Sequence, residues 1–421
     1  MKCISILINE MELTKKMIKS LKITNYKSIT DTISLDFSSD MPLMPMFGKN
    51  GSGKSTIFEA IYLLKEVFLF GMRSVDRIFM DNPTTFELEL ELDNQIFLYK
   101  VVLSLDKNEI THESLILTTP SNTYIYFIRD QYDITLGDRL EKLFNRFDFE
   151  RFKTYLYDLR FDKREFILSH LRIKDFSDSK NAIILNKLVD DIKNIHIFNE
   201  NADIRFYLDM DDAHYISVLS MVSKIYPEIE SLQYRKVTLD ELRFNLNRHR
   251  YDHLLDAFRN HVTKFSTTSF FVDAYNQFYK LKGRSLNELT VQAIDVYFKD
   301  GLVVAFDKLS SGLKKLLLLS MILLKTNPND LILIDDLTKD MDHHTALDFI
   351  DKIGPILKTH QRKLMFSTHD MLLLDSQIFD LKNICYTVKR DKIVLHYLNN
   401  LGIRKDKKLL NLYFEGFFDI L

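Results

Sequence analysis

The sequence predicts an α/β protein in which a sheet and its covering helices are built from the two ends of the chain. Near the N-terminus, an apolar strand, a glycine-rich turn and a helix-like segment follow one another within residues 43–64. From about residue 302 onward, apolar strands alternate with helical patterns, as in α/β proteins. Between the two ends, residues 121–290 are rich in Phe, Tyr, Leu, Lys and Arg with few helix breakers, which indicates a mainly helical insertion.

The composition is that of a globular protein with balanced charge. Of 421 residues, 46% are hydrophobic and 28% are charged, and the net charge of −2 gives no global electrostatic argument for nucleic-acid binding. The two cysteines, Cys3 and Cys385, form neither a disulfide framework nor a metal-ligand cluster. The most apolar run, 316–324, is far shorter than the ~20 residues that span a bilayer. We therefore expect a cytoplasmic protein with no membrane partner.

The pattern divides the chain into four parts. Residues 1–16 form an N-terminal extension, 17–120 an N-terminal lobe, 121–290 the insertion and 291–421 a C-terminal lobe. Period-two alternation predicts strands at 18–26, 33–37, 86–92, 96–105 and 291–298, with a hairpin turn at Asp93-Asn94. In the insertion, Thr238 and Glu241 have the spacing of a capping box, before one long helix or two stacked ones.

The glycine-rich turn fits the phosphate-binding pattern G-x-x-x-x-G-K-[ST]. It consists of Gly48, Lys49, Asn50, Gly51, Ser52, Gly53, Lys54, Ser55 and Thr56. Glycines let such a loop wrap closely around a polyphosphate, with its N–H groups and the following helix N-terminus pointing at the anion. Lys54 is expected to reach the β- and γ-phosphates of a nucleotide, and the Ser55 hydroxyl to hold Mg²⁺.

Three later stretches complete the pattern of a nucleotide site. An apolar strand at 331–334 ends in Asp335 and Asp336, where a hard cation needs an oxygen ligand. A second strand, 363–366, leads to a polar tip that contains His369. The segment Leu309-Ser310-Ser311-Gly312 precedes the long apolar helix and forms a second anion-binding helix start.

These motifs resemble those of ABC-type ATPases of the RecF, SMC and OLD branch, particularly bacterial abortive-infection and other anti-phage ATPases. The resemblance rests on residues 23–29, the phosphate loop, the segment 309–312, Asp335-Asp336 and Ser367-Thr368-His369-Asp370. It covers about 17–120 and 290–400.

The resemblance implies a homodimer, or a larger assembly, with two ATP molecules held between protomers. Leu309, Ser310, Ser311 and Gly312 of one protomer would contact the γ-phosphate held by Lys54 of the other. Asp335 and Ser55 would hold Mg²⁺. Lys54, Asp336 and His369 would act in catalysis. Asp342 would lie in the loop at the dimer interface, and Lys27 and Ser28 would lie near the nucleotide.

Two departures from the family pattern matter. The usual Asp-Glu pair is Asp335-Asp336 here, so the residue that positions the attacking water is one methylene short, and we expect slow hydrolysis. The glutamine that normally couples Mg²⁺ to the inserted domain has no clear counterpart, and residues 81–83 are the candidate replacement.

Three functions fit this sequence. The first is an ATP-gated sensor or scaffold that controls a separate effector, such as a nuclease, in phage defence. The second is a RecF-like DNA-maintenance clamp, whose nucleic-acid contacts would come from basic and aromatic residues in 235–284; a solvated helix face balanced by acidic residues explains them equally well. The third is a self-contained RNase toxin using Arg243 and His249, or Arg164 and His170.

Overall fold

The computed structural model describes residues 16–169, 182–199, 205–210, 212–264, 268–273, 278–375, 378–403 and 407–419. Apart from residue 16, the expected N-terminal extension lies outside these residues. The chain forms two compact units. Unit 1 consists of residues 1–199, 327–337 and 356–421, and unit 2 of residues 200–326 and 338–355.

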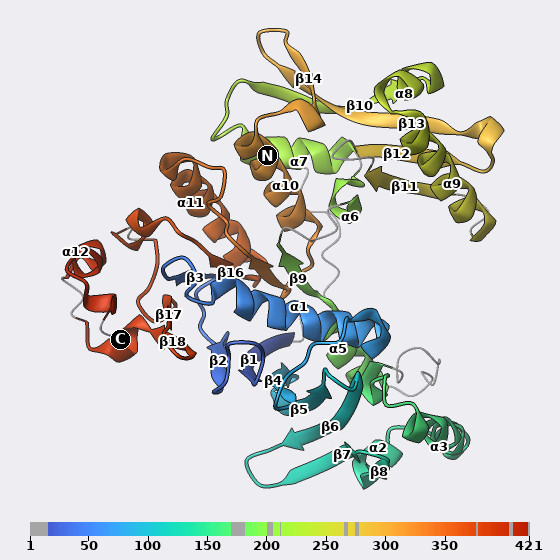
Figure 1. Cartoon of the computed structure of the whole chain (residues 1–421), viewed down its shortest axis with the longest axis vertical. Coiled ribbons are helices and arrows are strands. Elements are labelled where there is room, and N and C mark those ends of the chain that lie inside the picture. Colours follow the sequence, from blue (N-terminus) through green and yellow to red (C-terminus); the bar gives the residue numbers. More distant parts are fainter. Residues whose placement is uncertain are drawn as a thin grey trace. The chain divides into compact units, whose positions relative to one another are not determined.

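The central sheet of unit 1 has six strands in the order β18-β17-β3-β16-β15-β9 (Figure 1). These are β18 (Ile393–Tyr397), β17 (Cys385–Lys389), β3 (Leu43–Phe47), β16 (Lys363–Ser367), β15 (Leu331–Ile334) and β9 (Ile195–Phe198). All neighbouring strands are parallel except β18, which pairs antiparallel with β17. The carboxyl ends of β3, β16 and β15 therefore meet at one edge of the sheet, and the loops that follow them are brought together there.

The second sheet of unit 1 is antiparallel, in the order β2-β1-β4-β5-β6-β7-β8. Its strands are β1 (Lys16–Thr24), β2 (Ile33–Asp36), β4 (Thr84–Leu92), β5 (Gln95–Ser104), β6 (Glu109–Thr118), β7 (Thr123–Asp130) and β8 (Asp133–Leu136). Asp93 and Asn94 join β4 to β5 with φ angles of 51° and 60°, which the tight hairpin turn requires. Helix α1 (Lys54–Phe70) packs in one hydrophobic cluster with both sheets.

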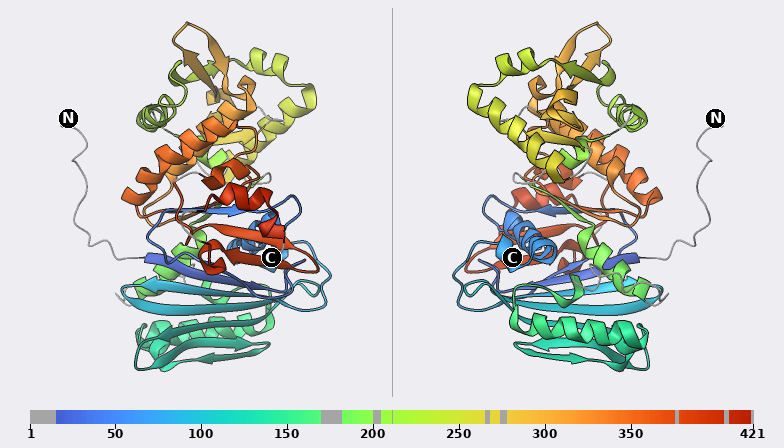
Figure 2. Two further views of the ribbon diagram at one scale, coloured as in Figure 1. Left: turned by 90° about the vertical axis from the view of Figure 1, so that its left-hand side faces the viewer. Right: turned by 90° about the vertical axis from the view of Figure 1, so that its right-hand side faces the viewer.

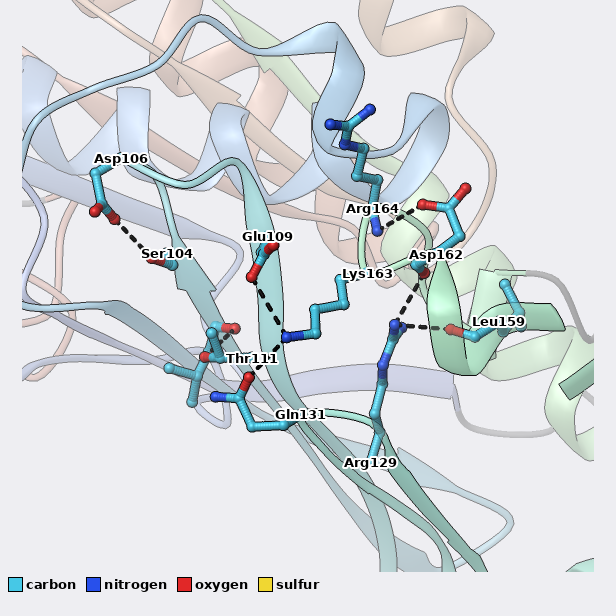
Figure 3. Close-up of polar contacts among 11 residues, drawn as sticks. Ser104, Asp106, Glu109, Thr111, Arg129, Gln131, Leu159, Asp162, Lys163 and Arg164 are labelled. Atoms are coloured by element: carbon cyan, nitrogen blue, oxygen red, sulfur yellow. Dashed lines mark hydrogen bonds and ion pairs between the residues drawn. The ribbon is translucent and has the colours of Figure 1, made fainter. Parts of the chain in front are cut away.

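Helices and buried polar contacts cover the far end of the antiparallel sheet. Helices α2 (Asp138–Glu141) and α3 (Arg146–Phe161) lie beside β7 and β8 (Figure 2). Arg129 on β7 donates to the carbonyl oxygens of Leu159 and Asp162 at the end of α3, both at 2.9 Å (Figure 3). The buried guanidinium of Arg129 therefore holds the end of α3 against the antiparallel sheet. Unit 1 also contains α5 (Ala182–Lys193) and α12 (Leu409–Phe414).

Unit 2 is built on an antiparallel sheet in the order β10-β13-β12-β11, with β14 pairing β13. Its strands are β10 (Ile229–Val237), β11 (Thr268–Asp273), β12 (Phe278–Gly283), β13 (Thr290–Phe298) and β14 (Val303–Ala305). Its helices are α6 (Arg205–Leu208), α7 (Asp212–Val222), α8 (Leu239–Asn245), α9 (Arg248–Lys264) and α10 (Ser311–Lys325). The Thr238 side chain accepts from the Glu241 N–H at 3.1 Å, so the expected cap is present, and two helices follow it rather than one.

The range 121–290 is more varied than the expected helical insertion. Helices predominate in it, but β7 and β8 extend the antiparallel sheet, β9 completes the central sheet, and β10 to β12 belong to unit 2. The observed units divide after residues 199, 326, 337 and 355, whereas the sequence pattern places boundaries at 120 and 290. Among the described helices, including α11 (His343–Thr359), none combines the length and apolar character needed to cross a membrane.

Candidate nucleotide-binding site

The phosphate-binding loop joins β3 to α1 at the carboxyl edge of the central sheet. Gly51 and Gly53 have φ angles of 75° and 99°, a left-handed conformation that glycine adopts without steric cost. Gly53 is the N-cap of α1, and Lys54 begins the helix. The helix N-terminus and the loop N–H groups thus form the positive end of a ready anion site.

A pocket of about 600 Å³ lies against this loop. It is lined by residues 50–56 together with Asp336, His369 and Lys389. All of these residues except Lys389 belong to motifs from which the sequence predicts a nucleotide site. The fold brings the three separate motifs together because β3, β15 and β16 are neighbouring or next-neighbouring parallel strands that all end at this edge.

The Lys54 side chain lies folded across the phosphate-binding loop. Its Nζ donates to the carbonyl oxygens of Gly48 at 2.6 Å and Lys49 at 3.1 Å, and lies 3.3 Å from Nδ1 of His369. Burial lowers the pKa of Lys54 to about 8, although Asp336 and Asp335 oppose the shift. Burial and the nearby Lys54 charge lower the pKa of His369. A neutral His369 therefore accepts through Nδ1, which places its proton on Nε2.

Ser367 links the two carboxylates that follow β15. Its hydroxyl donates to Oδ1 of Asp335 at 2.6 Å and accepts from the backbone N–H of Asp336, also at 2.6 Å. Asp336 has a φ of 53°, so its backbone turns left-handed as soon as the strand ends. This turn lets Asp336 line the pocket while Asp335 is held against β16.

The donor set suits Mg²⁺ as the partner of a nucleotide. In the part of the chain that the structure describes, no group of three or more His, Cys, Asp or Glu side chains could hold a metal alone. Mg²⁺ usually takes only one or two protein oxygens and completes its shell with water and substrate phosphates. The Ser55 hydroxyl and the Asp335 carboxylate are oxygen donors of that kind, and Ser55 lines the pocket.

Lys27 and Ser28 border the site from the turn after β1. The Lys27 ammonium pairs with Glu59 on α1 at 2.7 Å. The Ser28 carbonyl accepts from the N–H of Ile393 on β18 at 3.1 Å. Neither residue belongs to the lining of the pocket, so their contact with a nucleotide stays a prediction.

The other predicted residues lie in unit 2, where they pack against each other. Ser310 caps α10 by accepting from the Leu313 N–H at 3.4 Å. A Cβ on Gly312 would lie 2.5 Å from the carbonyl oxygen of Asp340, so only glycine lets the start of α10 approach the loop that contains Asp342. Asp342 in turn caps α11 through the N–H of Thr345 at 3.0 Å. The segment 309–312 and the Asp342 loop thus form one packed element.

Strand β17 was not assigned to the site by sequence reasoning. Thr387 forms a buried hydrogen bond of 2.7 Å with Ser52 of the phosphate loop, and Lys389 lines the pocket. The alternation of residues 385–397 is an ordinary strand signal with no functional motif. Only the pairing of β17 with β3 reveals that this segment borders the loop.

A family model described as "AAA domain, putative AbiEii toxin, Type IV TA system" matches residues 44–375. The match starts within β3 and ends just beyond His369, and it covers well over half of the chain. The chain belongs to this family. The motif-based resemblance to abortive-infection ATPases is thereby confirmed, and this AAA-domain protein is a P-loop ATPase of the AbiEii-type family.

Comparison with solved structures finds head domains of SMC proteins at low sequence identity. A SmcHead bound to the C-winged helix domain of ScpA is 13% identical, with 91% of this chain and 99% of that chain covered and a TM-score of 0.45. The SMC head domain from Thermotoga maritima is 14% identical, with 90% and 98% covered and a TM-score of 0.40. An Smc head from Pyrococcus furiosus, bound to the C-terminal domain of ScpA, is 13% identical, with 92% and 98% covered and a TM-score of 0.39. No curated protein matches the sequence.

Five basic residues of 235–284 in this AAA-domain protein lie beside acidic or aromatic neighbours. Arg235 pairs with Asp295 and Glu241, both at 2.7 Å, and Lys280 pairs with Asp209 at 2.5 Å. The others with such partners are Arg259 beside Asp256, Arg248 beside Asp252, and Arg243 over the ring of Tyr251. These pairs fit the solvated, charge-balanced face, and nucleic-acid binding by this range stays a prediction. Of the RNase candidates, His170 lies outside the described residues.

Proposed function

We propose that this protein binds and slowly hydrolyses ATP with Mg²⁺ and that its ATP state controls a partner effector. The observation that carries the proposal is the convergence of Lys54, Asp336 and His369 on one pocket beside the phosphate loop. Lys54 would leave the loop carbonyls for the β- and γ-phosphates, and Ser55 and Asp335 would hold Mg²⁺. When bound, Mg²⁺ neutralises the charge that develops on the phosphates.

Asp336 is the candidate for positioning the attacking water. It lines the pocket, and its carboxylate is close enough to Lys54 to raise the pKa of that lysine against the effect of burial. Its side chain is one methylene shorter than the glutamate usual at this place. Because catalysis by positioning is sensitive to shifts of about 1 Å, we infer that turnover is slow and the ATP-bound state is long-lived.

The signature segment of a second copy would complete the site. Ser310, Ser311 and Gly312 lie at the start of the fifteen-residue helix α10, whose N-terminus favours an anion. By resemblance to ABC-type ATPases, this anion would be the γ-phosphate of the nucleotide bound by Lys54 of the neighbouring copy. Asp342, packed into the same element as Gly312, would then also lie at the interface between copies.

Mixing two inactive variants tests ATP hydrolysis and the shared site together. K54A removes the lysine of each pocket, and S311R blocks the signature segment. In a mixture, the heterodimer has one pocket with an intact Lys54 and an intact partner segment, so ATPase activity should reappear. Mixing either single variant with the K54A/S311R double variant should restore nothing. Absence of activity in every mixture, with an active wild type, would contradict a site shared between copies.

Control of an effector in phage defence is the biological part of the proposal. The family description names a toxin of a toxin–antitoxin system, which supports a role in phage defence for this chain. Phage plating on cells that express the native operon with wild-type protein should be reduced, and K54A should abolish the protection. Equal plating on both would contradict a role for the ATP state.

A further inference from the structure

The hairpin of β17 and β18 packs directly against the phosphate-binding loop and the turn after β1. Strand β17 pairs in parallel with the last residues of β3, through Cys385 with Met46 and Tyr386 with Phe47. The N–H of Ile393 on β18 donates to the carbonyl of Ser28 at 3.1 Å. The hairpin therefore contacts the strand that leads into the phosphate-binding loop and the turn after β1.

The central contact is a pair of buried hydroxyls. Oγ1 of Thr387 and Oγ of Ser52 are 2.7 Å apart, and the two side chains are 1% and 5% exposed. The Thr387 hydroxyl also donates to the carbonyl oxygen of Phe47 at 3.2 Å. A hydroxyl has one proton to give, so Ser52 donates to Thr387, which donates to the end of β3. This chain of bonds ties the middle of the loop to the strand that precedes it.

The loop approaches the hairpin so closely at Gly48 that no side chain would fit there. A Cβ on Gly48 would lie 2.4 Å from Oγ1 of Thr387, 2.5 Å from Oγ of Ser52 and 2.7 Å from the Thr387 carbonyl oxygen. The first glycine of the motif therefore leaves room for the threonine as well as for the turn of the loop. The position of Thr387 and the shape of the loop depend on each other.

We propose that Thr387 is a positioning residue, which holds the phosphate-binding loop in its nucleotide-binding conformation through Ser52. The proposal rests on the ATP binding proposed above. A phosphate loop binds because its N–H groups converge on the anion before the anion arrives. Without the Thr387 hydroxyl, the buried Ser52 hydroxyl lacks its partner, the loop samples other shapes, and part of the binding free energy is spent on reordering it.

Two substitutions at one position separate the hydroxyl from the volume of the side chain. T387V keeps the shape and removes the hydroxyl, whereas T387S keeps the hydroxyl and removes a methyl group. We expect the ATP dissociation constant of T387V, measured by calorimetry, to rise about tenfold, as the loss of one buried hydrogen bond implies. T387S should stay within about threefold of the wild type. At saturating ATP, the kcat of T387V should be close to that of the wild type, so the effect appears in KM.

A loop-side variant keeps the test decisive if T387V folds poorly. S52A removes the same bond from the other partner and should weaken ATP binding to a similar extent, and T387V/S52A should be no worse than either single variant. An ATP affinity of T387V equal to that of the wild type, or equal losses in T387V and T387S, would overturn the proposal. Failure of the wild type itself to bind ATP, with K54A as the blank, would instead refute the proposed ATPase.

Discussion

The hydroxyl of Ser367 donates a 2.6 Å hydrogen bond to Oδ1 of Asp335, and Oγ of Ser367 accepts from the N–H of Asp336. Ser367 is 1% exposed and ends strand β16, beside β15. One buried hydroxyl therefore fixes both the carboxylate expected to hold Mg²⁺ and the backbone that aims Asp336. Groups that orient a metal ligand in this way usually affect metal affinity or activity about 10- to 100-fold.

S367A should accordingly raise the Mg²⁺ concentration needed for half-maximal ATPase activity about tenfold. A matched control is S320A, which removes an equally buried hydroxyl that donates to Leu316 O within α10. Its Mg²⁺ dependence should match that of the wild type. Superimposable Mg²⁺ titrations for S367A and the wild type would show that Ser367 does not orient the metal ligand.

Replacing Asp336 with glutamate should increase turnover, because the carboxylate gains the methylene that the usual residue has. The backbone opposes this change slightly: Asp336 has a φ of 53°, which aspartate tolerates better than glutamate, so D336E should also lose on the order of 1 kcal/mol of stability. D336N should bind ATP and hydrolyse almost none. Steady-state ATPase rates decide the question, and a folded D336E no faster than the wild type would contradict it.

The parts of the fold and of the site that are determined by residues close together in the sequence could be predicted from it. The nine residues of the phosphate loop specify a turn and a helix start locally. The apolar strands 331–334 and 363–366 are followed by Asp335 and His369, which places these polar side chains at one edge of the sheet. Alternation in β4 and β5 and the turn at Asp93-Asn94 likewise specify a hairpin without help from the rest of the chain.

Contacts between distant parts of the chain could not be predicted in this way. Ser52 and Thr387 are separated by 335 positions, and a threonine in an alternating strand is an ordinary β residue with no sign of its partner. Strand β9 has only four residues, and its place beside β15 is set by parallel pairing across the chain, not by its own sequence. The basic residues near 243–259 are a further example, because their positive charge in the sequence does not indicate which carboxylates lie beside them in the fold.

ATP affinity should fall as the pH rises above about 8. Burial lowers the pKa of Lys54 to about 8, so the free protein loses this proton above that pH, while bound phosphates require the ammonium. Binding must then take up a proton, and affinity should decrease by up to about tenfold per pH unit. Below pH 8 Lys54 is already charged, and it contributes no further change. Because the pKa of His369 is lowered from its usual value, His369 is neutral throughout this range.

Calorimetric titrations from pH 7 to 10, in buffers of different ionisation enthalpy, measure this proton uptake directly. K54R provides the control, since arginine keeps its charge over the whole range. Its affinity will be weaker, but its slope against pH should be much smaller than that of the wild type. A wild-type affinity that is constant from pH 7 to 10 would contradict the role given to Lys54.

Loss of the buried guanidinium of Arg129 should destabilise unit 1 strongly. Arg129 is 0% exposed and donates to three carbonyl oxygens, each at 2.9 Å: those of Leu159 and Asp162, shown in Figure 3, and that of Glu165. Its charge also compensates the buried carboxylate of Glu113. R129A removes these three hydrogen bonds and the counter-charge of that carboxylate, so the free energy of unfolding measured in urea should fall by about 3 kcal/mol. The control R160A removes a partly exposed arginine, which donates to the Tyr132 carbonyl at 2.9 Å and lies 3.4 Å from Asp133, and should cost about 1 kcal/mol. Similar losses for the two variants would mean that Arg129 is not what fixes the segment after α3 to the sheet.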